Sequence, residues 1–567
     1  MLRFSEYFLK SPIIGILKKR IQPISFVTKV DDFEVKNEPI LQYLKDSKER
    51  KELFDAIAKY KDSCVEIPIV VGNEEIRSGD VKYQVMPSDH GKKIAKYYWA
   101  GADVIQKAIS ESQRIRAEWE ATPLSERIKL FLKAADLVSG KYRMDLNATT
   151  MLGQAKNIMQ AEIDAAAELA DFFRYNAYFA KELSKYQPLS PDPNVTKNLF
   201  RFRGLEGFIA SISPFNFTAI GGNLASGPTL MGNVVLWKPS DTALLSNYTI
   251  FKLLREAGFP PGVINFIPSD GPVFGEVVTT SPHLAGINFT GSLRTFRLLW
   301  KLTAHCIDTY RNFPRLVGEC GGKNFHFVHK SADIQTVVSS SIRSAFEYSG
   351  QKCSALDRMY VPESLWPQIK KGLLEIRDQI KVGSPLDPET FVSAVIDDRA
   401  FKKIKSFIDH AKSSSDLTIL AGGTCDDSKG YFIEPTIIET KNPLDLIMQE
   451  EIFGPLLVVY VYKDAAVQEA LELVRINQYA LTGAIFAQDR DFIAHASEFL
   501  KMTAGNFYIN DKSTGSVVGQ QPFGGGRLSG TNDKAGGPHY MLRWTSPQTV
   551  KETLVPLSEW KYPYMSA

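Results

Sequence analysis

The stretch VVLWKPSDTALLSNYTIFKLLREAGFPPGVINFIPSD, residues 234–270, decides the fold. It holds a short apolar strand pattern at Val234–Trp237, a helical pattern at 242–257 that closes at Gly258, and a second strand pattern at Val263–Ile267. A strand, a helix and a strand in this order predict a right-handed βαβ unit with parallel strands.

The same alternation continues towards the C-terminus. The next expected elements are a helix at 272–279, a strand at Leu284–Phe289, a helix at 293–305 and a strand at Arg315–Val317. Four strands joined by helices predict a parallel sheet, and the fold class is α/β. Ligands bind at the carboxyl ends of such strands, where Lys238-Pro-Ser and Thr290-Gly-Ser lie. The chain has no G-x-G-x-x-G sequence, so the fold alone leaves the cofactor open.

Three further regions flank this unit. Residues 98–185 are expected to be helical, because apolar residues recur at three- and four-residue spacing in Trp99–Glu120, Leu124–Gly140 and Gln160–Glu182. Segment 186–199 is rich in proline and is interpreted as a protruding hairpin. A second α/β segment, about 322–525, runs into the glycine-rich PFGGGRLSG at Pro522–Gly530.

Composition excludes several classes of protein. The 567 residues are 44% hydrophobic and 23% charged, as in an ordinary globular protein, and a net charge of +3 disfavours nucleic acid as a partner. The five cysteines include no C-x-x-C pair, which disfavours disulfides and structural zinc. His326 and His329 lie in an alternating pattern typical of a strand, so no metal site is expected.

The chain shows no membrane span but has a basic N-terminus. The apolar stretch around 208–236 is interrupted by glycines and prolines, so it is not expected to cross a bilayer. Residues 1–28 carry five basic side chains against one acid, Glu6, with apolar residues between them. This composition predicts a mitochondrial transit segment, and the alternative is a basic N-terminal helix of a cytosolic protein.

Cys353 is the first candidate for chemistry. It follows Gly350, which is expected to end a helix, so its thiol is expected on a loop where neighbouring Lys352 could favour the thiolate. A buried, inert cysteine remains the alternative from this residue alone. Glu319 and Asn216, in GEC and PFN contexts, add a possible base and a possible polarising amide.

At these points the chain resembles the aldehyde dehydrogenase superfamily. The resemblance rests on GQKC around Cys353, on Glu319 and Asn216, and on the ordered motifs KPS, FTGS, EEIFGP and PFGG between about 207 and 530. It implies that Cys353 attacks an aldehyde, that the Asn216 amide and the Cys353 backbone N–H stabilise the oxyanion, and that Glu319 activates water. Cys320 is the rival nucleophile, although it lacks the G-Q-x-C context.

The resemblance also implies a cofactor site. The nucleotide would be NAD, with Lys238 and Ser240 at the adenosine ribose and Glu451 and Phe453 at the nicotinamide ribose. Asp241 would repel a 2′-phosphate if it points inward, which favours NAD over NADP. The pyrophosphate would lie near the following residues: Ser213, Gly291, Ser292, Leu293, Arg294 and Thr295.

The stretch 505–523 is similar to the branch of this superfamily that oxidises L-glutamate γ-semialdehyde, the open form of Δ1-pyrroline-5-carboxylate. The resemblance implies that Gly515 and Ser516 hold the substrate α-carboxylate. The other expected substrate contacts are Phe217, Ser354 and Phe523. Glu168 is interpreted as a surface salt-bridge residue, with contact to the substrate ammonium as the alternative.

The expected organisation follows from the same resemblance. An aldehyde dehydrogenase-like fold would use 29–185 and 204–321 for a Rossmann-type NAD-binding domain and 322–530 for an α/β catalytic domain. Segments 186–203 and 540–567 would serve oligomerisation in a homodimer located in the mitochondrial matrix. The alternatives are another semialdehyde, a coenzyme A-acylating variant, and a non-catalytic relative that only binds.

Overall fold

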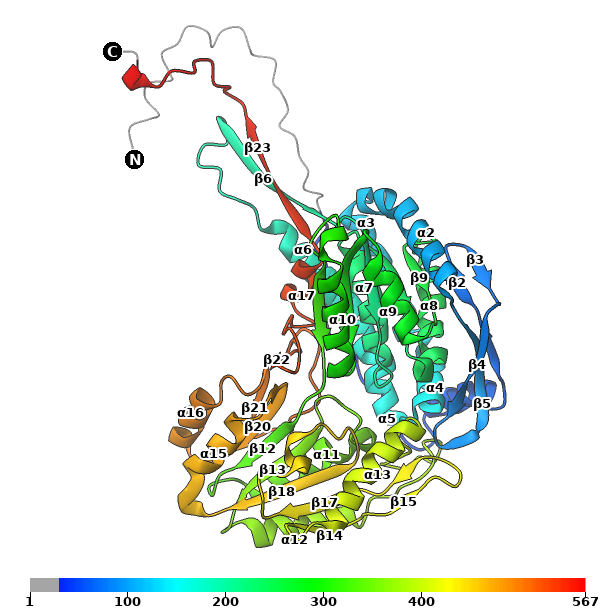
Figure 1. Ribbon diagram of the computed structural model, residues 1–567, viewed down its shortest axis with the longest axis vertical. Helices are drawn as coiled ribbons and strands as arrows, with labels where there is room; N and C mark the ends of the chain where they lie inside the picture. Colours follow the sequence, from blue (N-terminus) through cyan, green and yellow to red (C-terminus); the bar gives the residue numbers. More distant parts are fainter. Residues whose placement is uncertain (1–29, 566–567) are drawn as a thin grey trace.

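The computed structural model describes residues 30–565 and contains two seven-stranded sheets (Figure 1). The predicted transit segment, residues 1–28, lies outside the described residues. The first sheet has the order β11-β10-β7-β8-β9-β2-β3, and its five strands from β11 to β9 are parallel. These strands are β7 (Phe208–Ile212), β8 (Val234–Lys238), β9 (Ile264–Phe266), β10 (Leu284–Thr290) and β11 (Arg315–Glu319).

The predicted βαβ units are confirmed. The connecting helices are α8 (Leu244–Ala257), α9 (Gly271–Thr280) and α10 (Leu293–His305). Helix α8 ends at Gly258, whose φ of 112° is the left-handed conformation that glycine adopts readily. Strand β7, the middle one of the five parallel strands, was not predicted. Four of its five residues are buried, as in the predicted strand β8, but the small Ala210 and the polar Ser211 interrupt its run of large apolar residues.

The helical section lies on this sheet and includes a π-helix. Its helices are α2 (Ala102–Ala121), α3 (Leu124–Ser139), α4 (Arg143–Gln154), α5 (Ile158–Ala161), α6 (Leu169–Lys185) and α7 (Thr218–Leu230). The helix expected at Gln160–Glu182 is interrupted by a π-helical segment at Glu162–Glu168, and π-helical turns are frequent at functional sites. Trp99 belongs to β5 (Asp89–Trp99) and not to the following helix.

Smaller N-terminal elements complete this part of the molecule. They are α1 (Lys48–Lys61), β1 (Val65–Ile67), β2 (Ile69–Val71), β3 (Glu74–Ile76) and β4 (Asp80–Met86), of which β1, β5 and β4 form a three-stranded sheet.

The second sheet has the order β14-β17-β18-β13-β12-β20-β21. Its strands are β12 (Asn324–Val328), β13 (Leu356–Pro362), β14 (Leu417–Ala421), β17 (Thr436–Thr440), β18 (Leu456–Tyr462), β20 (Thr482–Phe486) and β21 (Asn506–Ile509). Its helices include α11 (Ile334–Phe346), α12 (Trp366–Arg377), α13 (Asp398–Ser413), α15 (Val467–Arg475) and α16 (Arg490–Phe499). His326 is buried in β12 between the hydroxyls of Ser341 and Ser513, which confirms the strand interpretation.

A two-stranded ribbon projects from the body (Figure 1). The segment interpreted as a local hairpin contributes only one strand, β6 (Thr196–Arg203), and its antiparallel partner is β23 (Ser546–Thr553) from the C-terminus. Helix α17 (Pro538–Arg543) packs through Tyr540 and Met541 into the hydrophobic core around the first sheet. The C-terminal segment therefore joins the ribbon only after it leaves the body.

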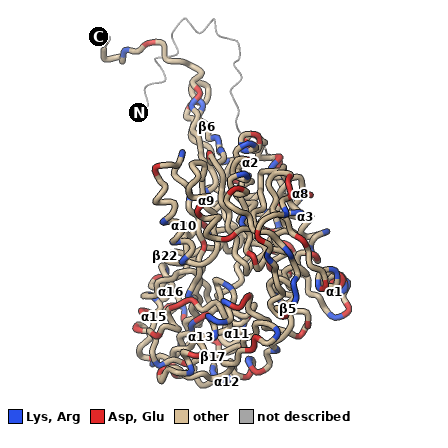
Figure 2. Tube along the Cα trace, turned by 45° about the vertical axis from the view of Figure 1, so that its right-hand side comes forward, with Lys and Arg blue, Asp and Glu red and all other residues tan. Residues whose placement is uncertain are grey.

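Charges of both signs are interspersed over the body (Figure 2), in keeping with the small net charge. Among residues 30–565, no helix is both long enough and apolar enough to cross a membrane, and no group of three or more His, Cys, Asp or Glu side chains is arranged to hold a metal ion.

Candidate active site

A cavity of about 140 Å³ brings together residues from both sheets and from the π-helix. Its wall contains seven of the predicted site residues: Phe217, Glu319, Cys353, Ser354, Gly515, Ser516 and Phe523. Asn216 and the predicted nucleotide contacts lie outside this wall. The cavity therefore has a catalytic end, at Cys353 and Glu319, and a substrate end, at Gly515 and Ser516.

The cysteine loop is held by a residue that the motifs did not point to. Asn324, at the start of β12, donates its side-chain N–H groups to the carbonyl oxygens of Cys353 and Ala355, both at 2.7 Å. Its Oδ1 accepts the amide of Thr482 at 3.0 Å. These bonds tie the loop before β13 to the neighbouring strands β12 and β20, so the half-buried thiol has a fixed position.

The Cys353 thiol is protonated at neutral pH in this environment. Burial raises its pKa well above the ordinary value, and the carboxylates of Glu319 and Glu451 raise it further. The expected help from Lys352 is not available, because its Nζ donates to Glu347 Oε2 at 2.8 Å. A base or an incoming electrophile must therefore take part in activating the thiol.

Glu319 has the properties of a base that works near neutral pH. It is the last residue of β11, and one of its carboxylate oxygens, Oε1, has no hydrogen-bond partner among the described residues. Burial raises the pKa of Glu319 to about 8, while Lys534 lowers it and Asp533 raises it. A carboxylate with an uncommitted oxygen can accept a proton from water or from a thiol.

Asn216 reaches the cysteine loop from the other sheet. Its side-chain N–H donates to the carbonyl of Gln351 at 3.1 Å, two residues before Cys353, and the amide has a second N–H. Helix α7 begins two residues later, at Thr218, and the Asp164 carboxylate caps it by accepting the amides of Thr218 and Ala219, both at 2.9 Å. Lys156 pairs with Asp164 at 2.7 Å, so a buried ion pair supports the Asn216 backbone.

Cys320 lacks the access that a nucleophile needs. Its side chain is buried, it lies outside the cavity wall, and burial raises its pKa to about 12.

The predicted nucleotide contacts lie at strand ends of the first sheet. Lys238 is the last residue of β8, and burial lowers the pKa of its amine. Asp241 Oδ1 accepts the indole N–H of Trp99 at 3.3 Å, so this oxygen is already hydrogen-bonded within the protein. The Ser213 hydroxyl accepts the Trp237 indole N–H at 2.7 Å.

Helix α10 offers a phosphate-binding end. Ser292 is its N-cap and accepts the Thr295 amide at 3.3 Å. The amides of Leu293 and Arg294 precede it in the first turn, where N–H groups have no partner within the helix. This donor set fits a pyrophosphate.

Glu451 and Phe453 lie beside the cysteine loop. Glu451 Oε1 accepts the Gly322 amide at 3.1 Å, and a Cβ at Gly321 would overlap this carboxylate. Phe453 has a φ of 63°, a left-handed conformation that costs a residue other than glycine on the order of 1 kcal/mol. Its ring contacts Phe215 edge-on at 5.7 Å, which helps to hold the conformation.

The substrate end is lined by a polar loop. The Ser354 hydroxyl lies 2.8 Å from the Thr514 hydroxyl, and Gly515 has a φ of 91° that favours glycine. The Ser516 hydroxyl donates to the Gln521 carbonyl. Four cationic side chains line the cavity: Arg343, Lys352, Lys512 and Lys534, of which the first two are paired with Glu347.

The interpretation of Glu168 as a surface residue is wrong. Its side chain is half-buried at the end of the π-helix and lines the cavity. Burial raises the pKa of Glu168 to about 8, and Asp164 raises it further. The nearest cation acting on it, Lys156, is bound to Asp164. Sequence spacing alone did not show which face of this helix points inward, because the π-helix shifts the helical phase.

The comparisons with known proteins agree on one family. The Aldehyde dehydrogenase family model matches residues 76–550. The chain is 60% identical over 535 residues to the mitochondrial delta-1-pyrroline-5-carboxylate dehydrogenase of Danio rerio, with 94% of this chain and 96% of that protein covered. The corresponding protein of Homo sapiens is 59% identical over 534 residues, with 94% of each chain covered.

A solved structure extends this agreement to the fold. The delta-pyrroline-5-carboxylate dehydrogenase of Mycobacterium tuberculosis, bound with NAD, superposes with a TM-score of 0.91 at 42% identity, over 95% of this chain and 100% of that chain. With a family model matching most of its length and relatives near 60% identity, the chain belongs to the aldehyde dehydrogenase family.

Proposed function

We propose that this protein is an NAD-dependent dehydrogenase that oxidises L-glutamate γ-semialdehyde, formed from Δ1-pyrroline-5-carboxylate, to L-glutamate in proline catabolism. One observation carries the proposal: a single cavity contains Cys353 and Glu319 at one end and, at the other, the Gly515–Ser516 loop and the Glu168 carboxylate. The loop suits an α-carboxylate, and Glu168 suits an α-ammonium. The similar proteins bear the same activity in their names.

The catalytic end performs the oxidation in two stages. The thiol proton of Cys353 passes to solvent as Sγ attacks the aldehyde carbon, and the oxyanion that forms is stabilised by the second N–H of Asn216 and the Cys353 backbone N–H. When bound, NAD would supply the hydride acceptor for this oxidation. Glu319 then removes a proton from water, and this water hydrolyses the thioester to the carboxylate.

The substrate end recognises the α-amino acid group. Backbone N–H groups of the Gly515–Ser516 turn and the Ser516 hydroxyl bind the α-carboxylate. The ammonium of Lys512, which donates to the neutral Thr514 carbonyl, favours this carboxylate. Glu168 accepts the α-ammonium. The rings of Phe217 and Phe523 flank the methylene groups. The nucleotide is held by Lys238, Ser240, Glu451 and Phe453. Residues 29–185 and 204–321 form the nucleotide-binding domain, and residues 322–530 form the domain that carries the Cys353 thiol.

The test is NADH formation from pyrroline-5-carboxylate against succinate semialdehyde and aminoadipate semialdehyde, with and without coenzyme A. The proposal predicts the highest kcat/KM for pyrroline-5-carboxylate and no dependence on coenzyme A, since Glu319 supplies the hydrolytic base. A higher kcat/KM for another semialdehyde contradicts the substrate. Absence of NADH with every aldehyde favours a non-catalytic binding protein.

We also place the protein in the mitochondrial matrix as a homodimer. The relatives from Danio rerio and Homo sapiens are named as mitochondrial, and residues 1–28 have a transit-like composition. The outer edge of β6 is capped by side chains of Gln187 and Ser190, which accept the amides of Phe200 and Asn198. Among residues 30–565 β23 pairs with no strand other than β6, and the ribbon projects from the body, so a partner subunit is expected to cover it. A stable monomer in light scattering at micromolar concentration contradicts the dimer, and failure of residues 1–28 to direct a reporter into the matrix contradicts the location.

A further inference from the structure

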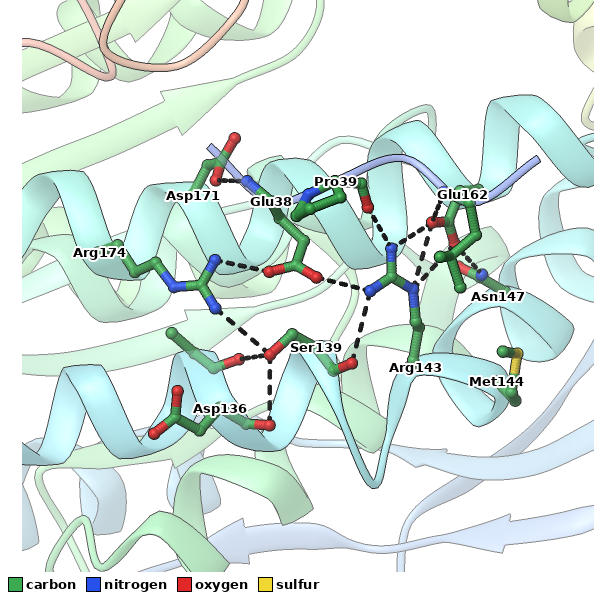
Figure 3. Close-up of polar contacts among 12 residues, drawn as sticks. Glu38, Pro39, Asp136, Ser139, Arg143, Met144, Asn147, Glu162, Asp171 and Arg174 are labelled. Carbon is green, nitrogen blue, oxygen red and sulfur yellow. Dashed lines mark hydrogen bonds and ion pairs between the residues drawn. The ribbon is translucent and has the colours of Figure 1, made fainter. Parts of the chain in front are cut away.

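The segment before the first helix crosses the helices that carry the substrate end. Residues 30–43, here called the strap, have no regular secondary structure and run over α4, the π-helix and α6. Figure 3 shows part of this crossing. Hydrogen bonds attach the strap to the body around Arg143 and around Asn37, and Lys181 of α6 also donates to Asp32 at 3.1 Å.

The first attachment is a buried ionic network. Arg143 donates to Glu38 Oε1 and to the Pro39 carbonyl, both at 2.7 Å, and also to Glu162 (Figure 3). The Leu41 amide and the Tyr43 hydroxyl donate to Glu162 at 2.9 and 2.7 Å. Glu162 begins the π-helix, so this attachment joins the strap to the segment that ends at Glu168.

The second attachment uses every hydrogen-bonding position of Asn37. Its Nδ2 donates to Asp171 Oδ2 at 2.7 Å and to the Val518 carbonyl at 2.9 Å. Its Oδ1 accepts the Gln520 amide at 2.8 Å and the Tyr175 hydroxyl at 3.0 Å. A side-chain amide has two N–H donors and one oxygen with two lone pairs, so this side chain is saturated and its orientation is defined.

Two of these four bonds go to the loop that forms the substrate end. Thr514, Gly515, Ser516, Val518 and Gln521 line the cavity. The loop closes on itself, because the amides of Gln520 and Gln521 donate to the Val517 carbonyl at 3.0 and 2.9 Å.

Asn37 binds this closed turn from outside the cavity. Gly519 of the turn packs so closely on Tyr175 that a Cβ would overlap the ring, and Tyr175 is itself bonded to Asn37. A closed turn moves as one body, so the contacts at Val518 and Gln520 set the place of Ser516 two residues away.

We propose that Asn37 is a positioning residue for substrate selection: it fixes the 514–521 loop at the distance and angle at which Gly515 and Ser516 receive an α-carboxylate. The inference rests on the proposed function and adds the strap to it. Asp171 supports the arrangement, because its carboxylate also accepts the Glu38 amide at 2.7 Å and thereby fixes the backbone that carries Asn37.

The test compares Asn37→Ala with the wild type on glutamate semialdehyde and on propanal, which has no carboxylate. We expect KM for glutamate semialdehyde to rise about five- to tenfold with kcat nearly constant, because ground-state positioning is lost and the reacting groups stay in place. Propanal kinetics should stay within about twofold. Equal losses with both aldehydes, or no loss with either, overturn the proposal.

Two controls separate positioning from stability. Lys36→Ala changes an adjacent strap side chain that is 84% exposed, and it should leave both aldehydes unaffected. Tyr43→Phe weakens the other attachment and should lower the melting temperature without changing the ratio of the two kcat/KM values. A changed ratio in Tyr43→Phe counts against an assignment to Asn37 in particular.

A double-mutant cycle tests the route of the effect. If Asn37 acts by placing Ser516, the loss in Asn37→Ala/Ser516→Ala should be smaller than the product of the single losses. If the loss in the double variant equals the product of the two single losses, Asn37 does not act by placing Ser516. Gln520→Ala, at an exposed loop position, removes the same contact from the loop side and should shift KM in the same direction if Asn37→Ala fails to fold. Absence of turnover in the wild type would overturn the proposed function instead, so the two failures are distinguishable.

Discussion

The two ends of the cavity are built on opposite principles. At the catalytic end, Glu319 keeps a carboxylate oxygen without a partner among the described residues, and burial shifts the pKa of both Glu319 and Cys353 upward. At the substrate end, Asn37 and the loop it holds satisfy one another's hydrogen bonds. Reacting groups must remain available to form new bonds, whereas a binding loop gains precision when its own bonds are complete.

Replacing the nucleophile should cause the largest loss of activity at the catalytic end. Cys353→Ala should reduce NADH formation by at least about four orders of magnitude for every aldehyde, because no covalent adduct can form. NAD binding, measured by calorimetry, and the melting temperature should stay close to wild type, since the thiol is remote from the predicted adenosine contacts. Substantial turnover by this variant would indicate that Cys320 is the nucleophile.

Removal of the base should stop a later step. Glu319→Gln should release one burst of NADH and then turn over about 10²- to 10⁴-fold more slowly, because water is no longer activated to hydrolyse the thioester. Rapid-mixing absorbance measures the burst, and mass spectrometry should detect an acyl adduct on Cys353. A steady state at the wild-type rate, or loss of the burst itself, contradicts this role.

The two ends also differ in how far the sequence revealed them. Cys353, Glu319 and Phe217 lie within short motifs at the ends of strands, and a pattern search finds such local groups. Four strands of the first sheet, β8 to β11, were predicted from apolar runs and helix spacing, whereas β2 and β3 were not. Strand β7 was missed because Ala210 and Ser211 interrupt its run of large apolar residues. The pairing of β6 with β23 joins distant parts of the chain with no local signal.

The substrate end depends on contacts between distant positions. Asn37 and Val518 are 481 positions apart, so neither residue predicts the other. Glu168 was misplaced because a π-helical segment changes which side chains share a face. Asn324 is a polar residue at the start of a strand, and only the tertiary structure shows that it holds the Cys353 loop.

A change at Ser516 separates the two ends by substrate. Ser516→Ala should lower kcat/KM for glutamate semialdehyde about ten- to a hundredfold, the expected value for one charge-assisted hydrogen bond. The lower part of this range is favoured, because the hydroxyl must first release the Gln521 carbonyl. Propanal should be nearly unaffected. Parallel losses for both aldehydes would mean that Ser516 only shapes the loop.

The smallest expected effect is a pH dependence of the kinetics. It should show the titration of one carboxylate at each end of the cavity, Glu319 at the catalytic end and Glu168 at the substrate end. Burial raises the pKa of both Glu319 and Glu168 to about 8, so both carboxylates are mostly protonated at pH 7 and become ionised as the pH rises. Once substrate is bound, its ammonium holds Glu168 ionised, and kcat should then follow Glu319 if thioester hydrolysis limits the rate. By contrast, kcat/KM covers only the steps up to hydride transfer, so it should follow the Glu168 carboxylate that must meet the ammonium.

Glu168→Gln supplies the reference for this measurement. Pyrroline-5-carboxylate changes its own form with pH, but the ratio of wild-type to variant kcat/KM, taken on one substrate solution at each pH, cancels that change. The ratio should rise about fivefold between pH 7 and pH 8, as the ionised fraction of a group with a pKa near 8 grows from roughly one eleventh to one half. With propanal the ratio should be constant, since this aldehyde has no ammonium. A constant ratio with glutamate semialdehyde would show that Glu168 does not meet the substrate nitrogen, and selection at this end would then depend on the carboxylate loop alone.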